Sequence, residues 1–233
     1  MKKLAIIPAR KWSKWIKNKN IKLLNKKPLI YYSIEAAIKS QIFDKICIAT
    51  DYNKEIINKI LSNSFNDTYS NIDIISLPDY LTKDDSKMID VVLYVLNFYK
   101  NNNFDLFTLL QPTSPLRTYK HILEAMQIFE DNKKFNSLVS FSYSKKHPYK
   151  SFVLKDNWIN PLFWTDNISL PRQLLPKIIA QNWAIYISKI DFFKKEKTFF
   201  SEPTYPYIMD EISSLDIDSE LDFYLTEYII KNV

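Results

Sequence analysis

The sequence has 233 residues, of which 46% are hydrophobic and 25% charged, as in one large globular domain with its own core. It has a single cysteine, Cys47, so an internal disulfide is excluded. It contains no run of about 18 apolar residues, so no membrane span is predicted. Residues 1–10 match a secretory signal poorly, which predicts a cytoplasmic location.

Short apolar runs and amphipathic segments alternate along the first 144 residues. The apolar runs are typical of buried parallel strands, and the longer segments are typical of helices that cover them. This alternation predicts a three-layer α/β fold with a mostly parallel, Rossmann-like sheet. The predicted strands are 4–9, 45–50, 71–77, 106–112 and 137–144, and the predicted helices are 28–40, 53–63, 86–100 and 118–132.

The alternation stops between residues 145 and 177, where prolines are frequent and no period is strong. A stretch of this length without clear elements is typical of a functional segment or an interaction arm. A strand is predicted again at 183–188. A further strand near 206–210, an acidic turn and a final helix capped by Ser219 complete the chain.

Positive charge is concentrated at the N-terminus. The formal net charge is +6, and residues 1–27 contain ten Lys or Arg and no acid. The basic residues follow one strand into one loop, 10–20, which suits a compact polyphosphate better than a long duplex. A solvated basic surface is the alternative.

Sheets of this kind bind ligands beyond the carboxyl ends of their strands. Asp51 and "QPTSPLR" (111–117) are also expected at this edge of the sheet. Asp51 fits helix capping equally well.

An acid-x-acid pair, Asp216 and Asp218, lies near the C-terminus. On a strand, this spacing would place both carboxylates on one face. Two neighbouring carboxylates suit Mg²⁺, which takes one or two protein carboxylates together with substrate phosphates and waters. The alternative is a solvated acidic face.

Four stretches together resemble the acylneuraminate cytidylyltransferases, which make CMP-sialic acid and its relatives. They are "IIPAR…SK…I…KN", "LLQPTSPLR", "PRQLLP…N…AIYI" and "DIDSELDF", in the order of that family and spread over residues 4–225. The resemblance implies a single domain, 1–233, with a nucleotide-diphospho-sugar transferase-like fold and an inserted dimerisation arm at about 147–170. It also implies transfer of CMP from CTP to a nine-carbon 2-keto sugar acid, as in surface polysaccharide biosynthesis, by a homodimer that needs neither a membrane nor nucleic acid.

The same resemblance implies roles for individual residues. Arg10, Lys19 and Asp218 would be catalytic, and Asp216 and Asp218 would hold Mg²⁺. Arg172 would bind the carboxylate of the sugar acid through its planar fork. Lys150 would act in the neighbouring subunit, and no general base is identified. The implied nucleotide-binding residues are Arg10, Ser13, Lys14, Lys19 and Asn20, and the implied sugar-binding residues are Gln111, Arg172, Gln173, Tyr186, Phe199 and Phe200.

The chain contains five tryptophans and no glycine, although average usage of about 7% predicts roughly 16 glycines. The family usually has glycine where this chain has Trp12, Trp15 and Trp183, and Trp158 and Trp164 lie in segments typical of loops. We interpret the tryptophans as glycines encoded by a UGA codon that was read as tryptophan. The alternative is a chain that has lost its glycines naturally.

Alternative functions remain open at this point. The same chemistry on legionaminic or pseudaminic acid fits the motifs as well as sialic acid does. A nucleotidyltransferase for another sugar acid or a sugar phosphate would share the loop and the fold. A non-catalytic polyanion-binding module would use only the basic N-terminus.

Overall fold

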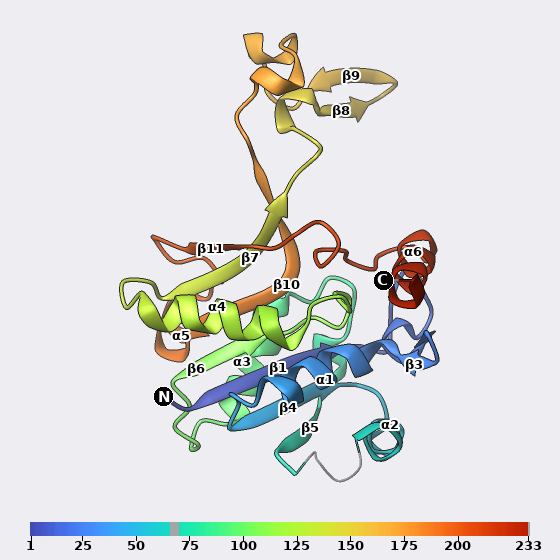
Figure 1. Ribbon diagram of the computed structural model, residues 1–233, viewed down its shortest axis with the longest axis vertical. Helices are drawn as coiled ribbons and strands as arrows, with labels where there is room; N and C mark the ends of the chain where they lie inside the picture. Colours follow the sequence, from blue (N-terminus) through green and yellow to red (C-terminus); the bar gives the residue numbers. More distant parts are fainter. Residues whose placement is uncertain (66–69, 233) are drawn as a thin grey trace.

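A seven-stranded sheet forms the centre of the computed structural model, which describes residues 1–65 and 70–232 (Figure 1). The strand order is β11-β7-β10-β6-β1-β4-β5. All neighbouring pairs are parallel except those that β10 makes with β6 and β7. The predicted mostly parallel sheet is therefore confirmed. Its strands are β1 (Lys3–Ala9), β4 (Lys45–Thr50), β5 (Ile72–Ser76), β6 (Leu106–Leu109), β7 (Ser137–Tyr143), β10 (Ile179–Lys189) and β11 (Tyr205–Ile208).

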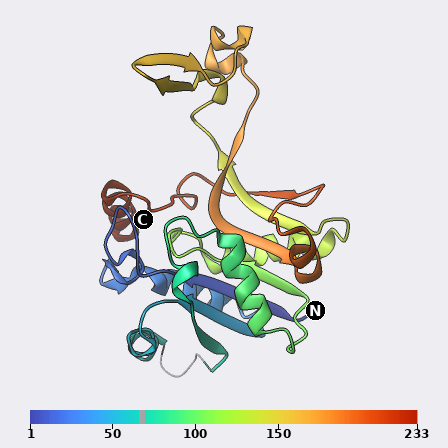
Figure 2. The same cartoon turned by 180° about the vertical axis from the view of Figure 1, so that it is seen from behind.

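Helices cover both faces of the sheet, because alternate side chains of each strand point to opposite sides. Ala5 and Ile7 of β1 pack with α1, α2 and α4, whereas Leu4 and Ile6 pack with α3 and α5. Figure 1 shows α1 and α4 on the near face, and Figure 2 shows α3 on the opposite one. The predicted three layers are thus present. The helices are α1 (Leu29–Ser40), α2 (Lys54–Phe65), α3 (Met88–Phe98), α4 (Tyr119–Asp131), α5 (Ile190–Glu196) and α6 (Glu220–Asn232).

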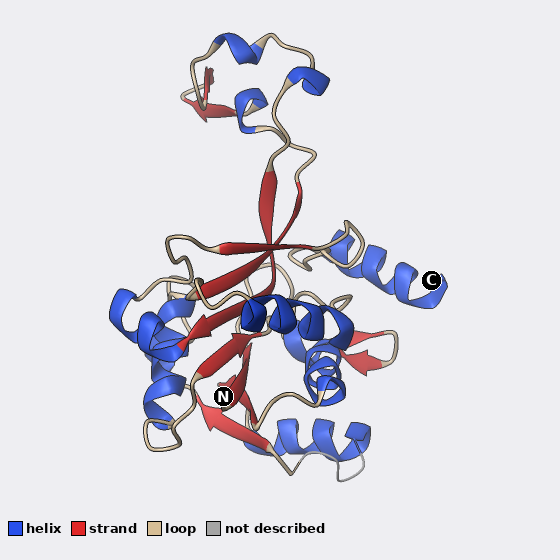
Figure 3. Cartoon of the chain, turned by 60° about the vertical axis from the view of Figure 1, so that its left-hand side comes forward, coloured by secondary structure: helices blue, strands red, loops and turns tan. Residues whose placement is uncertain are grey.

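The segment between β7 and β10 projects from the body as an arm (Figures 1 and 3). Its outer part is a hairpin of β8 (Phe152–Lys155) and β9 (Trp158–Pro161), flanked by the 3-10 turns Pro148–Lys150, Asp166–Ile168 and Arg172–Leu174. The sequence pattern did not reveal this hairpin. Both of its strands are exposed on both faces, so no alternation of buried and exposed positions marks them.

The C-terminal helix α6 packs beside the loop after β1. Phe223 of α6 and Ile217 share a small core with Ile16, Leu24 and Leu29. Leu24 belongs to a short ribbon of β2 (Leu23–Leu24) and β3 (Lys27–Pro28). This core holds the C-terminal helix against the loop at the carboxyl end of β1.

Among residues 1–65 and 70–232, no helix is long and apolar enough to cross a membrane.

Candidate active site

The loop after β1 folds back onto the strand from which it leaves. Asn20 is buried, and its Nδ2 donates to the carbonyl of Arg10 at 2.8 Å. Asp51, at the end of β4, accepts from the amide of Lys11 at 2.6 Å. Helix α2 is capped instead by Asn53, whose Oδ1 accepts from the amide of Glu55 at 2.9 Å. Asp51 therefore fixes the loop, and the capping role suggested for it is wrong.

A cavity of about 380 Å³ lies at the carboxyl ends of β1 and β6, where the sequence placed a ligand site. The cavity collects the basic loop, the segment after β6 and the acid-x-acid pair from three distant parts of the chain. Basic and acidic groups therefore face a single space. The predicted residues that line it are Arg10, Ser13, Lys14, Lys19, Asn20, Gln111, Asp216 and Asp218.

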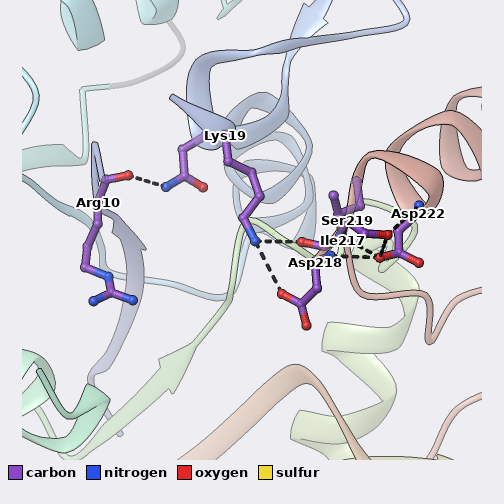
Figure 4. Close-up of polar contacts among 7 residues, drawn as sticks. Arg10, Lys19, Ile217, Asp218, Ser219 and Asp222 are labelled. Carbon is purple, nitrogen blue, oxygen red and sulfur yellow. Dashed lines mark hydrogen bonds and ion pairs between the residues drawn. The ribbon is translucent and has the colours of Figure 1, made fainter. Parts of the chain in front are cut away.

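Lys19 connects the basic loop to the acidic pair (Figure 4). Its side chain is only 13% exposed. Its Nζ donates to the carbonyl of Ile217 at 2.7 Å and lies 3.4 Å from Oδ1 of Asp218. An ammonium group held in this way points into the cavity with hydrogen-bonding capacity to spare, since it has three donors.

Asp216 and Asp218 lie in a loop, so the strand geometry considered for this pair does not apply. The loop is fixed by Asp222, which accepts from the amides of Asp218 at 3.1 Å and Ser219 at 2.7 Å. Ser219 in turn accepts from the amide of Asp222 at 3.3 Å, so the predicted cap of the final helix is confirmed. Despite the missing strand, both carboxylates line the same cavity.

The two carboxylates differ in environment. Burial raises the pKa of Asp216 to about 7, and the neighbouring Asp218 adds to the rise, whereas Thr113 and Lys19 oppose it. Oδ1 of Asp216 is buried and has no hydrogen-bond partner among the described residues. The side chain of Asp218 is 74% exposed.

Asp216 and Asp218 are the residues of the cavity that could hold Mg²⁺. An unpartnered buried oxygen and an accessible carboxylate oxygen are the hard ligands that this ion prefers. Within 1–65 and 70–232, no group of three or more His, Cys, Asp or Glu side chains could hold a metal. An ion held by Asp216 and Asp218 would complete its coordination with phosphate and water.

The turn before α3 forms a side of the cavity that the sequence did not indicate. Arg10 donates to the carbonyl of Lys83 at 2.6 Å, and the indole of Trp12 donates to Asp84 at 3.2 Å. Asp84 and Met88 both line the cavity. The only local signal was the polar run "KDDSK" ahead of a predicted helix, which is common on surfaces.

Arg172 and Gln173 do not line this cavity within one chain. They lie on the arm, in a second cavity of about 410 Å³ that also includes His147 and Lys177. There Arg172 donates to the carbonyl of Ser144 at 3.2 Å. The structure of a single chain thus separates these two predicted sugar-binding residues from Gln111. Lys150, on the same arm, donates to the carbonyl of Ile168.

The three predicted sugar-binding aromatics, Tyr186, Phe199 and Phe200, are not among the residues that line the cavity. Tyr186 is buried in the sheet, with its ring centroid 4.9 Å from that of Phe199, and Phe199 packs 5.0 Å from Phe193. Phe200 is 41% exposed. The ring of Trp183, which does line the cavity, lies 6.5 Å from Tyr186. Tyr186 and Phe199 are therefore core residues next to the cavity, with Trp183 at the boundary.

The five tryptophans are all exposed, by 45% to 81%, although tryptophan is usually well buried. Trp183 has φ 61, in the left-handed region that glycine adopts without strain. Trp12 and Trp15 are not among the described residues with positive φ. The backbone thus supports glycine at 183, whereas at 12 and 15 the case rests on the space that their indoles occupy in the cavity.

Comparison with known proteins agrees with this arrangement. The sequence profile of the cytidylyltransferase family matches residues 4–231. The chain is 34% identical to an N-acylneuraminate cytidylyltransferase of Escherichia coli over 95% of its own length and 50% of that protein. It thus spans about half the length of that relative. A CMP-N,N'-diacetyllegionaminic acid synthase of Legionella pneumophila is 33% identical, with 99% of this chain and 97% of that one covered.

Solved structures show the same fold. A CMP:2-keto-3-deoxy-manno-octonic acid synthetase complexed with CTP superposes with a TM-score of 0.72 at 14% identity, covering 99% of both chains. A 4-diphosphocytidyl-2C-methyl-D-erythritol synthase from Anaerococcus prevotii gives 0.69 at 11% identity, covering 99% of this chain and 96% of that one. Since the family profile spans nearly the whole chain and the cavity lies where its motifs meet, this chain belongs to the cytidylyltransferase family.

Proposed function

We propose that the protein transfers CMP from CTP to the anomeric hydroxyl of a nine-carbon 2-keto sugar acid and releases pyrophosphate. The observation that carries the proposal is the cavity at the ends of β1 and β6, which joins the basic loop to Asp216 and Asp218. The substrate class comes from the relatives, which are named for sialic, legionaminic and pseudaminic acids.

The residues of the cavity would act mainly by positioning and by electrostatics. Arg10 and Lys14 would bind the β- and γ-phosphates, and Ser13 and Asn20 would contribute hydrogen bonds to the nucleotide. Lys19 would donate to the α-phosphate, where negative charge increases as the acceptor oxygen bonds to phosphorus. The bond from that phosphorus to the bridging oxygen breaks, pyrophosphate leaves with the electron pair of that bond, and the proton of the acceptor hydroxyl is released to solvent.

Asp216 and Asp218 would hold Mg²⁺ in this proposal. When bound, the ion would neutralise phosphate charge and stabilise the pyrophosphate leaving group. The positive charge would also favour the ionised form of Asp216, whose pKa burial raises. CTP is a cytoplasmic nucleotide, so a cytoplasmic location is part of the proposal.

The acceptor would bind between the cavity and an arm from a second copy of the chain. Gln111 lines the cavity, but Arg172 and Gln173 lie on the outlying arm. Apolar side chains such as Leu154 and Trp158 are exposed on the hairpin, and an isolated two-stranded hairpin is marginally stable in water. A homodimer in which each arm covers the partner's cavity would bury these side chains and complete the site.

The direct test is a pyrophosphate-release assay with CTP, Mg²⁺ and a panel of sialic, legionaminic and pseudaminic acids. Turnover of one acid supports the proposal and identifies the substrate. If no acid on the panel is turned over while generic RNA or DNA is retained on a filter in a salt-sensitive manner, the protein is a polyanion-binding module instead.

Asp218→Asn preserves shape and removes one negative charge. We expect a loss of turnover of at least about tenfold, equivalent to ~1.4 kcal/mol, that is greatest at limiting Mg²⁺. Glu220→Gln is the matched control, because Glu220 pairs with Lys22 and is not among the residues that line the cavity. If turnover at limiting Mg²⁺ is unchanged in Asp218→Asn, Asp218 does not belong to the site.

Arg172→Lys keeps the charge and loses the planar fork that binds a carboxylate in a bidentate manner. We expect the KM for the sugar acid to rise about tenfold while CTP affinity is maintained, as for one lost charge-assisted bond. Equal losses for both substrates would assign Arg172 to the fold.

Mixed dimers distinguish action within one chain from action across the interface. If Arg172 serves the partner, a dimer of an Arg172→Ala chain and a Lys19→Met chain contains one intact site and regains activity. If Arg172 serves its own chain, both sites of that dimer are defective and the activity stays low.

A further inference from the structure

Arg117 is a buried cation that the proposed chemistry does not use. It ends the "QPTSPLR" segment, is only 1% exposed and is the largest fully buried side chain among the described residues. No carboxylate in 1–65 or 70–232 forms an ion pair with it. Burial accordingly lowers the pKa of Arg117 to about 9. Burying a charge without a counterion is costly, so its hydrogen bonds must offset the loss of water.

Those hydrogen bonds join three distant segments of the chain. Nη1 of Arg117 donates to the carbonyls of Gln111 at 3.3 Å and Ala184 at 3.1 Å, and Nη2 donates to the hydroxyl of Ser33 at 2.7 Å. The Ser33 hydroxyl donates in turn to the carbonyl of Gln111 at 3.2 Å. We call these four residues the Arg117 cluster. It connects the end of β6, strand β10 and helix α1.

Two of these connections lie directly behind the cavity. Gln111 and Thr113 line it after β6, and Trp183 lines it from β10. The carbonyl of Thr113 accepts from the amide of Ile217 at 2.8 Å, so the segment held by Arg117 also holds the loop of the acidic pair. A shift of the Gln111 backbone would therefore also displace Thr113 and the loop that carries the acidic pair.

Strand β10 is irregular where the cluster holds it. Its register with β7 shifts between Gln181 and Tyr186, and residue 183 has φ 61. The side chain of Asn182 accepts from Ser140 at 2.6 Å and from the amide of Ala184 at 3.3 Å. The irregularity turns residue 183 toward the cavity, and the bond from Arg117 to Ala184 connects it to the Gln111 segment.

We infer that Arg117 is a positioning residue that sets the spacing between the Gln111–Thr113 segment and residue 183, and thereby the acceptor side of the cavity. The inference rests on the proposed function for the identity of the acceptor. Arg117 is not among the residues that line the cavity. Its role requires the planar fork, since one guanidinium reaches two carbonyls and a hydroxyl together, which an ammonium on a linear stem does not reproduce.

Arg117→Lys tests this role by kinetics. We expect the KM for the sugar acid to rise about tenfold and kcat to fall, while CTP affinity stays within about twofold, because a small misplacement of positioning groups costs rate. Met126→Ala is the control for lost stability, since Met126 is buried in α4 and takes part in none of the hydrogen bonds of the Arg117 cluster. If Arg117→Lys lowers the melting temperature as Met126→Ala does but leaves the KM for the sugar acid unchanged, Arg117 is purely structural and the inference fails.

Ser33→Ala provides a milder variant that removes one member of the cluster and keeps the charge. We expect a smaller rise in the same KM, and less than additive effects when it is combined with Arg117→Lys. Additive effects would show that the two side chains act independently, contrary to the inference.

Amide hydrogen exchange tests the cluster without any turnover. In Ser33→Ala, and in Arg117→Lys if it folds, exchange should accelerate in 111–117 and 182–186 more than in β4. Uniform acceleration would overturn the inference. If the wild-type protein turns over no acid yet exchange accelerates only in these segments, the cluster stands and the proposed function fails.

Discussion

Replacing Trp12, Trp15 and Trp183 together by glycine is expected to raise the rate of CMP transfer by about 100-fold. This is the usual gain when a misplacement of about 1 Å between reacting groups is removed. The three indoles line the cavity at the ends of β1 and β6, and each contributes on the order of 200 Å² of side-chain surface. Trp12 also donates to Asp84, which holds the loop toward α3. Glycine at these positions would open the space that phosphates and sugar need.

Position 183 should contribute in a second way. Its φ of 61 costs a residue with a Cβ about 1–2 kcal/mol, so glycine there should raise the free energy of unfolding by about this amount. Removal of the indole would also expose Tyr186 to the cavity, since Trp183 lines the cavity and its ring lies next to Tyr186. The predicted contact of Tyr186 with the sugar would then become feasible.

The pyrophosphate-release assay compares the turnover of three proteins: the triple-glycine variant, the chain with its five tryptophans, and Trp158→Gly. Trp158 is 77% exposed on the hairpin of the arm and does not line the cavity, so its replacement should leave CTP affinity unchanged. Equal rates for the first two proteins would show that the loop does not approach the phosphates. Mass spectrometry of peptides 11–17 from the native protein shows directly whether residues 12 and 15 are glycine or tryptophan.

Lys19→Met should lower turnover by about 100- to 1,000-fold, the usual cost of removing one donor that stabilises charge in a transition state. Methionine preserves much of the apolar stem of this 13% exposed side chain and removes the ammonium that bonds to Ile217 and faces Asp218. Because the α-phosphate gains charge as the reaction proceeds, the loss should appear mainly in kcat.

Lys22→Met is the matched control. Lys22 follows the same loop, pairs with Glu220 at 2.6 Å and does not line the cavity. It should alter turnover by less than about twofold, since surface ion pairs contribute little. If turnover falls by the same small factor in Lys19→Met and in Lys22→Met, Lys19 does not contact the phosphate that is transferred.

The sequence by itself determined the layered α/β architecture. Continuous apolar runs such as 45–50 are recognisable because strands buried on both faces need apolar side chains throughout. The sequence also predicted that the short loop 10–20 lines a ligand site, because it follows a strand end directly, and the loop does line the cavity at the ends of β1 and β6. The Asp216–Asp218 pair was recognised by its spacing and by resemblance, even though its backbone is a loop.

The tertiary structure decided which distant groups meet. Nothing local shows that β10 runs antiparallel between β6 and β7, or that the carbonyl of Ala184 lies within reach of Arg117. The sequence also could not show that Arg172 and Gln111 lie in different cavities. Both belong to family motifs, and it is the projecting arm that places Arg172 away from Gln111. Sequence patterns report which face of an element is buried, whereas the pairing of segments far apart in the chain depends on how those faces pack together.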